Sequence, residues 1–356
     1  MGDYVYTDED LYGRDHQPQP SDIRQNRIGD CGFDSTLGSL AHQQPKRIED
    51  AIKYDAHSQS FTVTMYKQGP DGKAEAVLVH VAQSDIKADI GEGGDTTGFH
   101  HSRHDTPIWP AVYEAAYAKM SEPPGGDIKA GFHRIEGGGI WPTDAQYMVT
   151  GIRGETVKAA DVQHIGMDDA YKKIHTALKE GHPVALSTKD ENPGAAKDGL
   201  DNHHVYMLEG IHKDKQGDVQ VTLRNPWGTN TGINEGHDTP NAHITVKLKD
   251  ITEGGGLNRI DIGPSPSQKP DLANPQASIV PTGDKDLDHL FATMHDPAAF
   301  GQALTDLANS PYGQAFHAEG RAQYAEIQNQ QLQTQLTQQQ NQPAPAQVQQ
   351  GPVMSH

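Results

Sequence analysis

The chain has a single cysteine, Cys31, among its 356 residues. One cysteine cannot form an internal disulfide, so a small fold held together by disulfides is excluded. Positive charge is also scarce, since 29 Lys and Arg stand against 48 Asp and Glu, a formal net charge of −19. This balance argues against nucleic acid or an anionic membrane surface as a partner. Taken alone, the lone thiol is either a buried apolar group or a reactive nucleophile.

Long apolar runs are absent as well. No stretch of about 18 apolar residues occurs, so we expect no transmembrane helix. Residues 1–10 are polar and acidic, without the basic and apolar regions of a secretory signal. We therefore expect a cytoplasmic location at synthesis. Export by a bacterial system that uses no N-terminal signal is a second hypothesis.

The surroundings of Cys31 favour a reactive thiol. Gly29-Asp30 is a turn and helix-start signal, and Phe33 and Leu37 continue at helical spacing. This pattern predicts that Cys31 lies in the first turn of a helix, where the helix dipole and unpaired backbone N–H groups favour a thiolate. Gln25, six residues earlier, can place an amide donor beside the sulfur.

A second segment supplies polar partners for such a thiol. Residues 204–210 and 219–225 read as two strands joined by a hairpin. A hairpin symmetric about the bond between Asp214 and Lys215 places His204 directly opposite Asn225, with Cβ atoms about 5 Å apart. His203 is the alternative histidine, and the register favours His204. Trp227, two residues after Asn225, can shield a His–Asn hydrogen bond from water.

These residues match the roles of a thiol hydrolase. Such a site needs a thiolate, a histidine as acid and base, a group that orients the imidazole, and donors for an oxyanion. The chain offers Cys31, His204, Asn225 and Gln25 for these roles in turn, with the Cys31 N–H as a second oxyanion donor.

The same residues resemble the calpain-type cysteine proteases of the papain-like superfamily. The motifs are Gln25…Gly29-Asp30-Cys31…Phe33, His204…Tyr206 and Arg224-Asn225-Pro226-Trp227-Gly228. The helix Trp109…Lys119, the glycines before Thr150-Gly151 and the strand Leu257–Ile262 also resemble family segments. The resemblance covers roughly residues 8–263.

The resemblance implies an α+β, papain-like fold of two lobes, with a helical lobe carrying Cys31 and a β-rich lobe carrying His204 and Asn225. It implies that these three residues form the catalytic triad and that Gln25 is an oxyanion donor. Gly29, Asp30 and Trp227 become supporting residues, and Gly138 helps to form a wall of the cleft.

The chain departs from the family at Gly32, where an aromatic residue usually follows the nucleophile. We expect this glycine to loosen the backbone or to open the cleft. The stretch after Gly228 lacks the tryptophan-and-acid run of the calcium-dependent animal enzymes, and no EF-hand pattern occurs. We therefore expect no metal or other cofactor, and a reaction that depends weakly or not at all on calcium. Residues 84–107, rich in Gly, Asp and His, read as a loop. Within it, His100, His101 and His104 lack a fourth ligand and read as solvated residues.

The chain divides by composition. We expect a polar lead-in at 1–20, the protease domain at 21–263, a linker at 264–285, a short helical region at 286–327 and a disordered tail at 328–356. Gln makes up 13 of the 28 residues from 323 to 350. The tail is either an inert linker, a helix that pairs with a partner, or a signal for a secretion or adaptor protein.

Three functions remain open. The first is a cysteine endopeptidase, a thiol protease of bacterial type without calcium-binding regulatory domains, which takes protein or peptide substrates. The second is an acyl-transfer or deamidating enzyme on the same triad. The third is a catalytically relaxed interaction module or secreted effector. Cleavage preference and physiological substrate do not follow from the sequence.

Overall fold

The chain separates into two units, residues 1–280 and 281–356. The computed structural model describes residues 5–69, 71–95, 106–123, 126–191, 199–231, 238–239, 241–273, 278–279, 288–290, 293, 297–311, 313–314, 318 and 321. The second unit contains helix α13 (Pro297–Asn309), within the region expected to be helical. Residues 328–356 and the histidines at 100, 101 and 104 lie outside the described residues. In the part of the chain described, no helix is long and apolar enough to span a bilayer.

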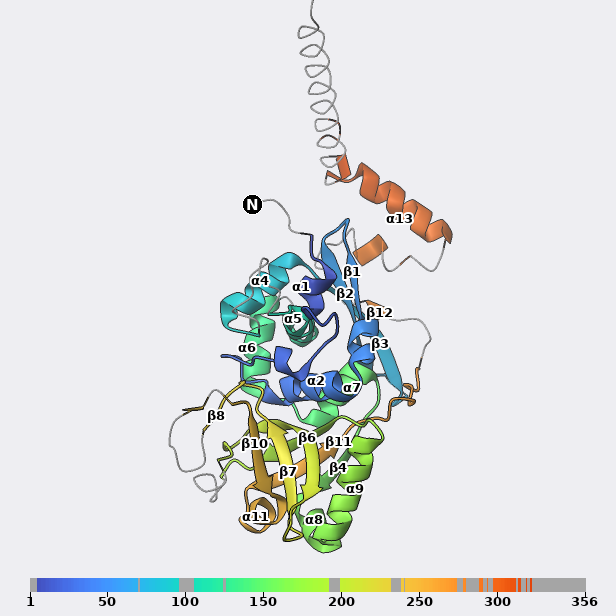
Figure 1. Cartoon of the computed structure of the whole chain (residues 1–356). Coiled ribbons are helices and arrows are strands. Elements are labelled where there is room, and N and C mark those ends of the chain that lie inside the picture. The colour runs from blue at the N-terminus through green and yellow to red at the C-terminus, as the bar shows by residue number, and fades with distance from the viewer. Residues whose placement is uncertain are drawn as a thin grey trace, which may run out of the picture. The chain divides into compact units, whose positions relative to one another are not determined.

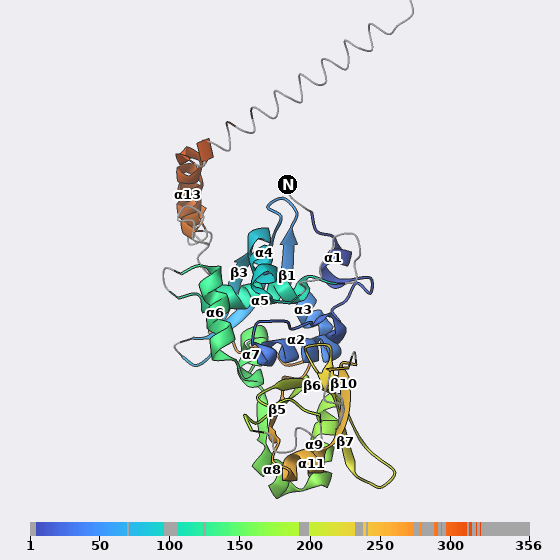
Figure 2. The same ribbon diagram turned by 90° about the vertical axis from the view of Figure 1, so that its left-hand side faces the viewer.

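The first unit has two lobes, stacked in both views (Figures 1 and 2). The upper, helical lobe has its own apolar core, which includes Phe33, Leu37, Trp109 and Tyr113. Its helices are α1 (Asp8–Tyr12), the 3₁₀ turn η1 (Pro20–Asp22), α2 (Cys31–Gln43), α3 (Pro45–Ala51), α4 (Gln83–Glu92), α5 (Trp109–Ser121), α6 (Ile128–Gly138) and α7 (Pro142–Thr150).

A small sheet completes the helical lobe. Its strand order is β1-β2-β3-β12, formed by β1 (Ile52–Asp55), β2 (Ser60–Gln68), β3 (Ala74–Val81) and β12 (Ser278–Ile279). Strands β2 and β3 alternate between more and less buried residues and pair antiparallel, as their period-2 sequence pattern predicts. Strand β12 adds to β3 in parallel.

The lower lobe is a six-stranded antiparallel sheet in the order β10-β7-β6-β5-β11-β4. Its strands are β4 (Glu155–Lys158), β5 (Val184–Thr188), β6 (Val205–Lys213), β7 (Val219–Arg224), β10 (His243–Lys247) and β11 (Leu257–Ile262). Its helices are α8 (Ala159–Ile165), α9 (Met167–Lys179) and α11 (Leu248–Glu253), and a two-stranded ladder joins β8 (Asn230–Thr231) to β9 (Asp238–Thr239). The predicted α+β, two-lobed fold is confirmed.

Helix α2 lies where the lobes meet, against β5 and β6 (Figure 1). The Ser35 hydroxyl donates to the Val205 carbonyl at 2.8 Å, and the Ser39 hydroxyl donates to the Val184 carbonyl at 2.9 Å. Gly38 lies against Met207, so closely that a Cβ there would come within 2.2 Å of the Met207 methyl carbon. The helix that begins at Cys31 is therefore fixed to the strands of the other lobe.

The chain returns to the helical lobe after β11. Side chains of helix α3 and the residue before it bind this segment: the Gln44 amide donates to the Pro264 carbonyl at 2.7 Å, and the Arg47 guanidinium donates to the carbonyls of Ser265 and Gln268. Leu272 then forms a bridge with Ala74 ahead of β12. The described parts of the expected linker, 264–273 and 278–279, are thus packed within the first unit, and the domain boundaries themselves stay predictions.

One expectation about local structure needs correction. Residues 84–107 read as a loop, but α4 occupies Gln83–Glu92, because Ile86 packs into the core and Asp85 accepts from the Ala82 N–H at the helix start. Within the expected lead-in, Thr7 caps α1, and Leu11 and Tyr12 are buried.

Candidate active site

Cys31 is the first residue of α2, as predicted. The turn before it is made by backbone groups, since the Asp30 carbonyl accepts from the N–H groups of Phe33 and Asp34. The rest of the first turn is buried, while Cys31 itself is half-buried and lines a cleft between the lobes. The helix therefore presents the thiol to the cleft and buries the residues behind it.

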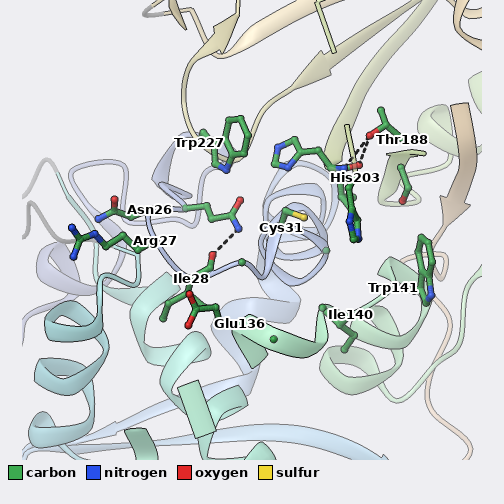
Figure 3. A pocket seen from close by; sticks show the side chains of 18 residues that line it. Asn26, Arg27, Ile28, Cys31, Glu136, Ile140, Trp141, Thr188, His203 and Trp227 are labelled. Carbon is green, nitrogen blue, oxygen red and sulfur yellow. Dashed lines mark hydrogen bonds between the residues drawn. The ribbon is translucent and has the colours of Figure 1, made fainter. Parts of the chain in front are cut away.

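The cleft has a volume of about 580 Å³ and takes its lining from both lobes. The helical lobe contributes Gln25–Gly29, Cys31, Gly32 and the segment 136–141, and the β-rich lobe contributes Ser187, Thr188, residues 203–205 and Trp227. Figure 3 shows the Cys31 sulfur in the middle of these side chains. Of the proposed site residues, Cys31, Gln25, Gly29, His204 and Trp227 line the same cleft.

His204 and Asn225 are in direct contact. His204 Nε2 lies 2.9 Å from Asn225 Oδ1, and both side chains are buried. Asn225 Oδ1 also accepts from the Trp227 backbone N–H at 3.0 Å. A backbone N–H can only donate, so this bond fixes which end of the amide is oxygen. His204 Nε2 must therefore carry the proton in the neutral ring, which leaves Nδ1 as the basic nitrogen.

The register behind this contact differs from the prediction. Met207 pairs with Arg224 and Leu208 with Leu223, and a bulge at Glu209 shifts the following pairs by one residue. The hairpin is therefore centred near Gln216, and His204 does not face Asn225 across the ladder. The two side chains meet because His204 immediately precedes β6 and Asn225 immediately follows β7.

Neighbouring groups hold His204 in place. The His204 backbone N–H donates to the Thr188 hydroxyl at 2.9 Å, and the His204 carbonyl accepts from the Thr188 N–H. The rings of Trp227 and Tyr206 lie 4.2 and 4.9 Å away between centroids. His203 instead adopts a left-handed backbone with φ 49° and turns a mostly exposed ring toward Asp190, 3.7 Å away. The structure thus places His204, not His203, beside Asn225.

Gln25 lines the same cleft as Cys31 and is held by its own backbone. Its N–H donates to the Pro226 carbonyl at 3.0 Å, which ties it to the loop that carries Asn225. Its side-chain amide donates to the Ile28 carbonyl at 2.8 Å and reaches Asp30 Oδ1 at 3.5 Å. An amide nitrogen has two protons, so both donors of Gln25 are engaged, and the longer bond to Asp30 is the one that a ligand of the cleft would have to replace.

The electrostatics of the resting site differ from the expected thiolate. Burial raises the pKa of Cys31 to about 11, and the neighbouring Asp30 adds to this shift, while backbone hydrogen bonds from Val205 and Gly32 lower it by less. Burial lowers the pKa of His204 to about 4, against the opposing effect of its bond to Asn225. Both groups are therefore neutral near pH 7, and desolvation outweighs the helix dipole at the sulfur.

Buried carboxyl groups lie behind the nucleophile. Asp34, Asp89, Asp95 and Glu114 are buried in the helical lobe, and burial together with their mutual repulsion raises the pKa of each well above its usual value. Burial also raises the pKa of Asp30 to about 7. Carboxyl groups in such surroundings hold protons at neutral pH.

Both oxygens of Asp34 lack a hydrogen-bond partner among the described residues, which makes this acidic cluster a candidate for a calcium site. Calcium requires several oxygen ligands that converge on one point. Among the described residues, no three or more His, Cys, Asp or Glu side chains converge in this way. The buried acids therefore do not fit the ion as they stand.

Gly32 has a role opposite to the expected one. A Cβ at this position would lie 1.8 Å from the Ile140 carbonyl oxygen. The wall segment before α7 therefore packs directly on the turn that carries the thiol, so the missing side chain closes the cleft wall onto α2 instead of opening it. Gly138, expected in this wall, is the last residue of α6, between Gly137 and Gly139, which line the cleft.

The chain is similar to known proteins over much of its length. Residues 7–237 match the family model described as calpain family cysteine protease. The chain belongs to the calpain family of cysteine proteases. The matched range contains Cys31, His204 and Asn225.

The relatives share only part of their length with this calpain-family chain. It is 25% identical over 214 residues to calpain-13 of Rattus norvegicus, which is 58% of this chain and 29% of that protein. It is 26% identical over 236 residues to the calpain-type cysteine protease ADL1 of Oryza sativa subsp. japonica, which is 64% of this chain and 10% of that protein. The similarity thus spans less than a third of either relative.

Three residues of the site escaped the sequence reading. Thr188 anchors the His204 backbone, Trp141 lines the cleft, and Arg259 places its guanidinium carbon 3.8 Å from the centre of the Trp141 ring. The only signal in the sequence was the pair Trp141-Pro142 directly after the glycine-rich segment, which marks a helix start with an aromatic residue outside it.

Proposed function

We propose that the chain is an endopeptidase that cleaves protein substrates through Cys31, His204 and Asn225. The observation that carries the proposal is the 2.9 Å contact between the buried Asn225 Oδ1 and Nε2 of His204, a residue that lines the same cleft as Cys31. This contact leaves His204 Nδ1 without a proton, and the ring is oriented by Asn225 Oδ1, which is itself held by the Trp227 N–H. No other cysteine exists in the chain to serve as nucleophile.

Because both groups rest neutral, the reaction begins with a proton transfer. His204 Nδ1 takes the Cys31 thiol proton as the sulfur attacks the peptide carbonyl carbon, and the C=O π electrons move to the oxygen. When the tetrahedral intermediate collapses, the C–N bond breaks and His204 gives its proton to the leaving amine. A water molecule, deprotonated by His204, then attacks the thioester, and the Cys31 sulfur leaves and regains the proton.

The developing negative charge on the oxygen needs donors that are already in place. The proposed pair is the Cys31 N–H at the start of α2 and the Gln25 amide proton that reaches Asp30 Oδ1 at 3.5 Å in the resting site and exchanges this long bond for one to the oxyanion. Support for Gln25 is its backbone bond to Pro226, which holds it between the nucleophile and the Asn225 loop. Trp227 covers the His204 ring from the same loop.

We propose further that the reaction does not require calcium. Support comes from the acidic residues, which do not converge on a metal position among the described residues, and from the absence of an EF-hand pattern in the sequence. Cleavage measured in a chelator and in added calcium tests this point, and equal rates are expected. A rate that rises at least tenfold with calcium contradicts it.

The experiment that tests the function is mass spectrometry of denatured protein substrates after incubation with the full chain. Fragments with new termini are expected. Cys31→Ala and His204→Ala should each lower the rate by several orders of magnitude, and His203→Ala should retain it.

Other outcomes point to the alternatives. Intact substrate chains with small mass changes would indicate acyl transfer or deamidation. Full cleavage by Cys31→Ala protein, or no reaction of the wild type with substrates or with an epoxide warhead such as E-64, would overturn the proposal, and the second result would favour an interaction module.

A further inference from the structure

The wall of the cleft opposite Trp227 is built on Gly32. The Ile140 carbonyl oxygen occupies the place of a Gly32 side chain, 1.8 Å from where a Cβ would be. Thr36, one turn further along α2, donates to the Gly32 carbonyl at 2.8 Å and reaches the Pro142 carbonyl at 3.5 Å. The segment 139–142 is therefore seated on the first turn of the helix that carries the nucleophile.

This seat fixes the backbone of Trp141. Its carbonyl accepts from the N–H groups of Asp144 and Ala145, so it is the residue from which α7 starts. Because the backbone on both sides of Trp141 is held, the direction in which its side chain projects is defined. The indole ring can therefore present a surface at a fixed place.

Arg259 of strand β11 covers one face of that ring. The guanidinium carbon lies 3.8 Å from the ring centre, and the guanidinium donates to Asp261 Oδ2 at 3.0 Å and to the Thr143 hydroxyl at 3.4 Å. Asp261 is fully buried and also accepts from Thr156 at 2.6 Å. The Arg259 guanidinium is thus held by Asp261 of the β-rich lobe, and it covers one face of the Trp141 indole.

The remaining surface of Trp141 is open. The side chain is 44% exposed and lines the cleft, and Trp227, 39% exposed, lines it too. Figure 3 shows these two labelled residues on opposite sides of Cys31. A large apolar surface left open inside a cleft is a binding surface for apolar groups.

We propose that Trp141 is a specificity-determining residue, which takes an apolar side chain of the peptide substrate on its open face, and that Gly32 is the positioning residue that holds it beside the nucleophile. The inference rests on the proposed peptidase function. A Cβ at Gly32 pushes the Ile140 carbonyl away, which moves Trp141 relative to the sulfur and to Arg259. Loss of the indole removes the apolar surface and leaves the triad untouched.

The test is a cleavage-site profile. A mixture of peptides from denatured proteins is digested with wild type, Trp141→Ala, Trp141→Phe and Gly32→Ala, and the cut sites are read by mass spectrometry. We expect one position near the scissile bond at which wild type favours apolar side chains. Trp141→Ala should reduce that preference by about tenfold or more, as for other apolar pockets, and Trp141→Phe should keep most of it. Gly32→Ala should weaken both the preference and kcat/KM.

Gly91→Ala is the matched control for Gly32→Ala, since Gly91 is also a helical glycine of the same lobe but has no atom within 4 Å of an added Cβ. It should behave as wild type. If wild type cleaves and Trp141→Ala shows an unchanged profile, the inference is wrong while the peptidase function stands. If Gly32→Ala is not folded, the Trp141 variants still decide the matter. If wild type cleaves nothing, the proposed function fails and the inference fails with it.

Discussion

Removal of the Asn225 side chain tests the tautomer on which the proposed mechanism depends. In Asn225→Ala, the His204 Nε2 proton loses its acceptor inside a buried site. An unsatisfied buried donor costs about 1–3 kcal/mol. The ring can avoid this cost by moving its proton to Nδ1, which removes the base that faces the thiol. If the activation barrier rises by this cost of about 1–3 kcal/mol, kcat falls by about 5- to 150-fold.

The assay is kcat on a peptide that wild type cleaves, combined with the imidazole ¹⁵N chemical shifts of His204. Asn225→Asp is the informative companion, because its oxygens still accept from Nε2 while its negative charge raises the pKa of His204 from about 4. The acid limb of its pH–rate profile should therefore move to higher pH. Asn258→Ala, at an asparagine of β11 outside the cleft lining, is the control. A folded Asn225→Ala protein with more than half of the wild-type kcat would refute the reasoning.

Three further predictions follow from burial and packing. Alkylation of resting Cys31 by iodoacetamide should climb steadily from pH 7 toward its pKa of about 11, and a plateau at neutral pH would contradict the neutral thiol. Thermal stability should fall as pH rises from about 4 to about 7, since the folded chain retains protons on Asp30 and Asp34 that the unfolded chain has released; Asp34→Asn should flatten this slope in a melting-temperature series. Gly38→Ala should cost about 1–3 kcal/mol in urea unfolding, because its Cβ meets Met207, and an unchanged midpoint would show that Met207 yields freely.

Local patterns in the sequence predicted the elements that present the site. The start of α2 at Cys31 follows from a turn signal and an apolar repeat, and both can be read within a dozen residues. The hairpin register was wrong because the bulge between Leu208 and Gly210 has no local signature. The contact between His204 and Asn225 was nevertheless anticipated, since both residues flank the same pair of strands.

The remainder depends on contacts between distant segments. Trp141 and Arg259 are separated by 118 positions and meet only because β11 returns to the middle of the sheet. The role of Gly32 could not be inferred either, since the Ile140 carbonyl arrives from another helix–loop segment. The neutral state of the Cys31 thiol could not be inferred for a similar reason. Burial is a property of the assembled lobes, whereas the helix dipole can be read from the local sequence.

The position of strand β11 also determines how far the chain must extend to fold. The match to the calpain family ends at residue 237, yet β11 (Leu257–Ile262) lies between β5 and β4 in the six-stranded sheet. A protein shortened to the matched residues would leave β4 without a strand to pair with and would expose the long edge of β5 to other chains. Such a fragment is expected to aggregate, and the shortest soluble form should end beyond residue 262.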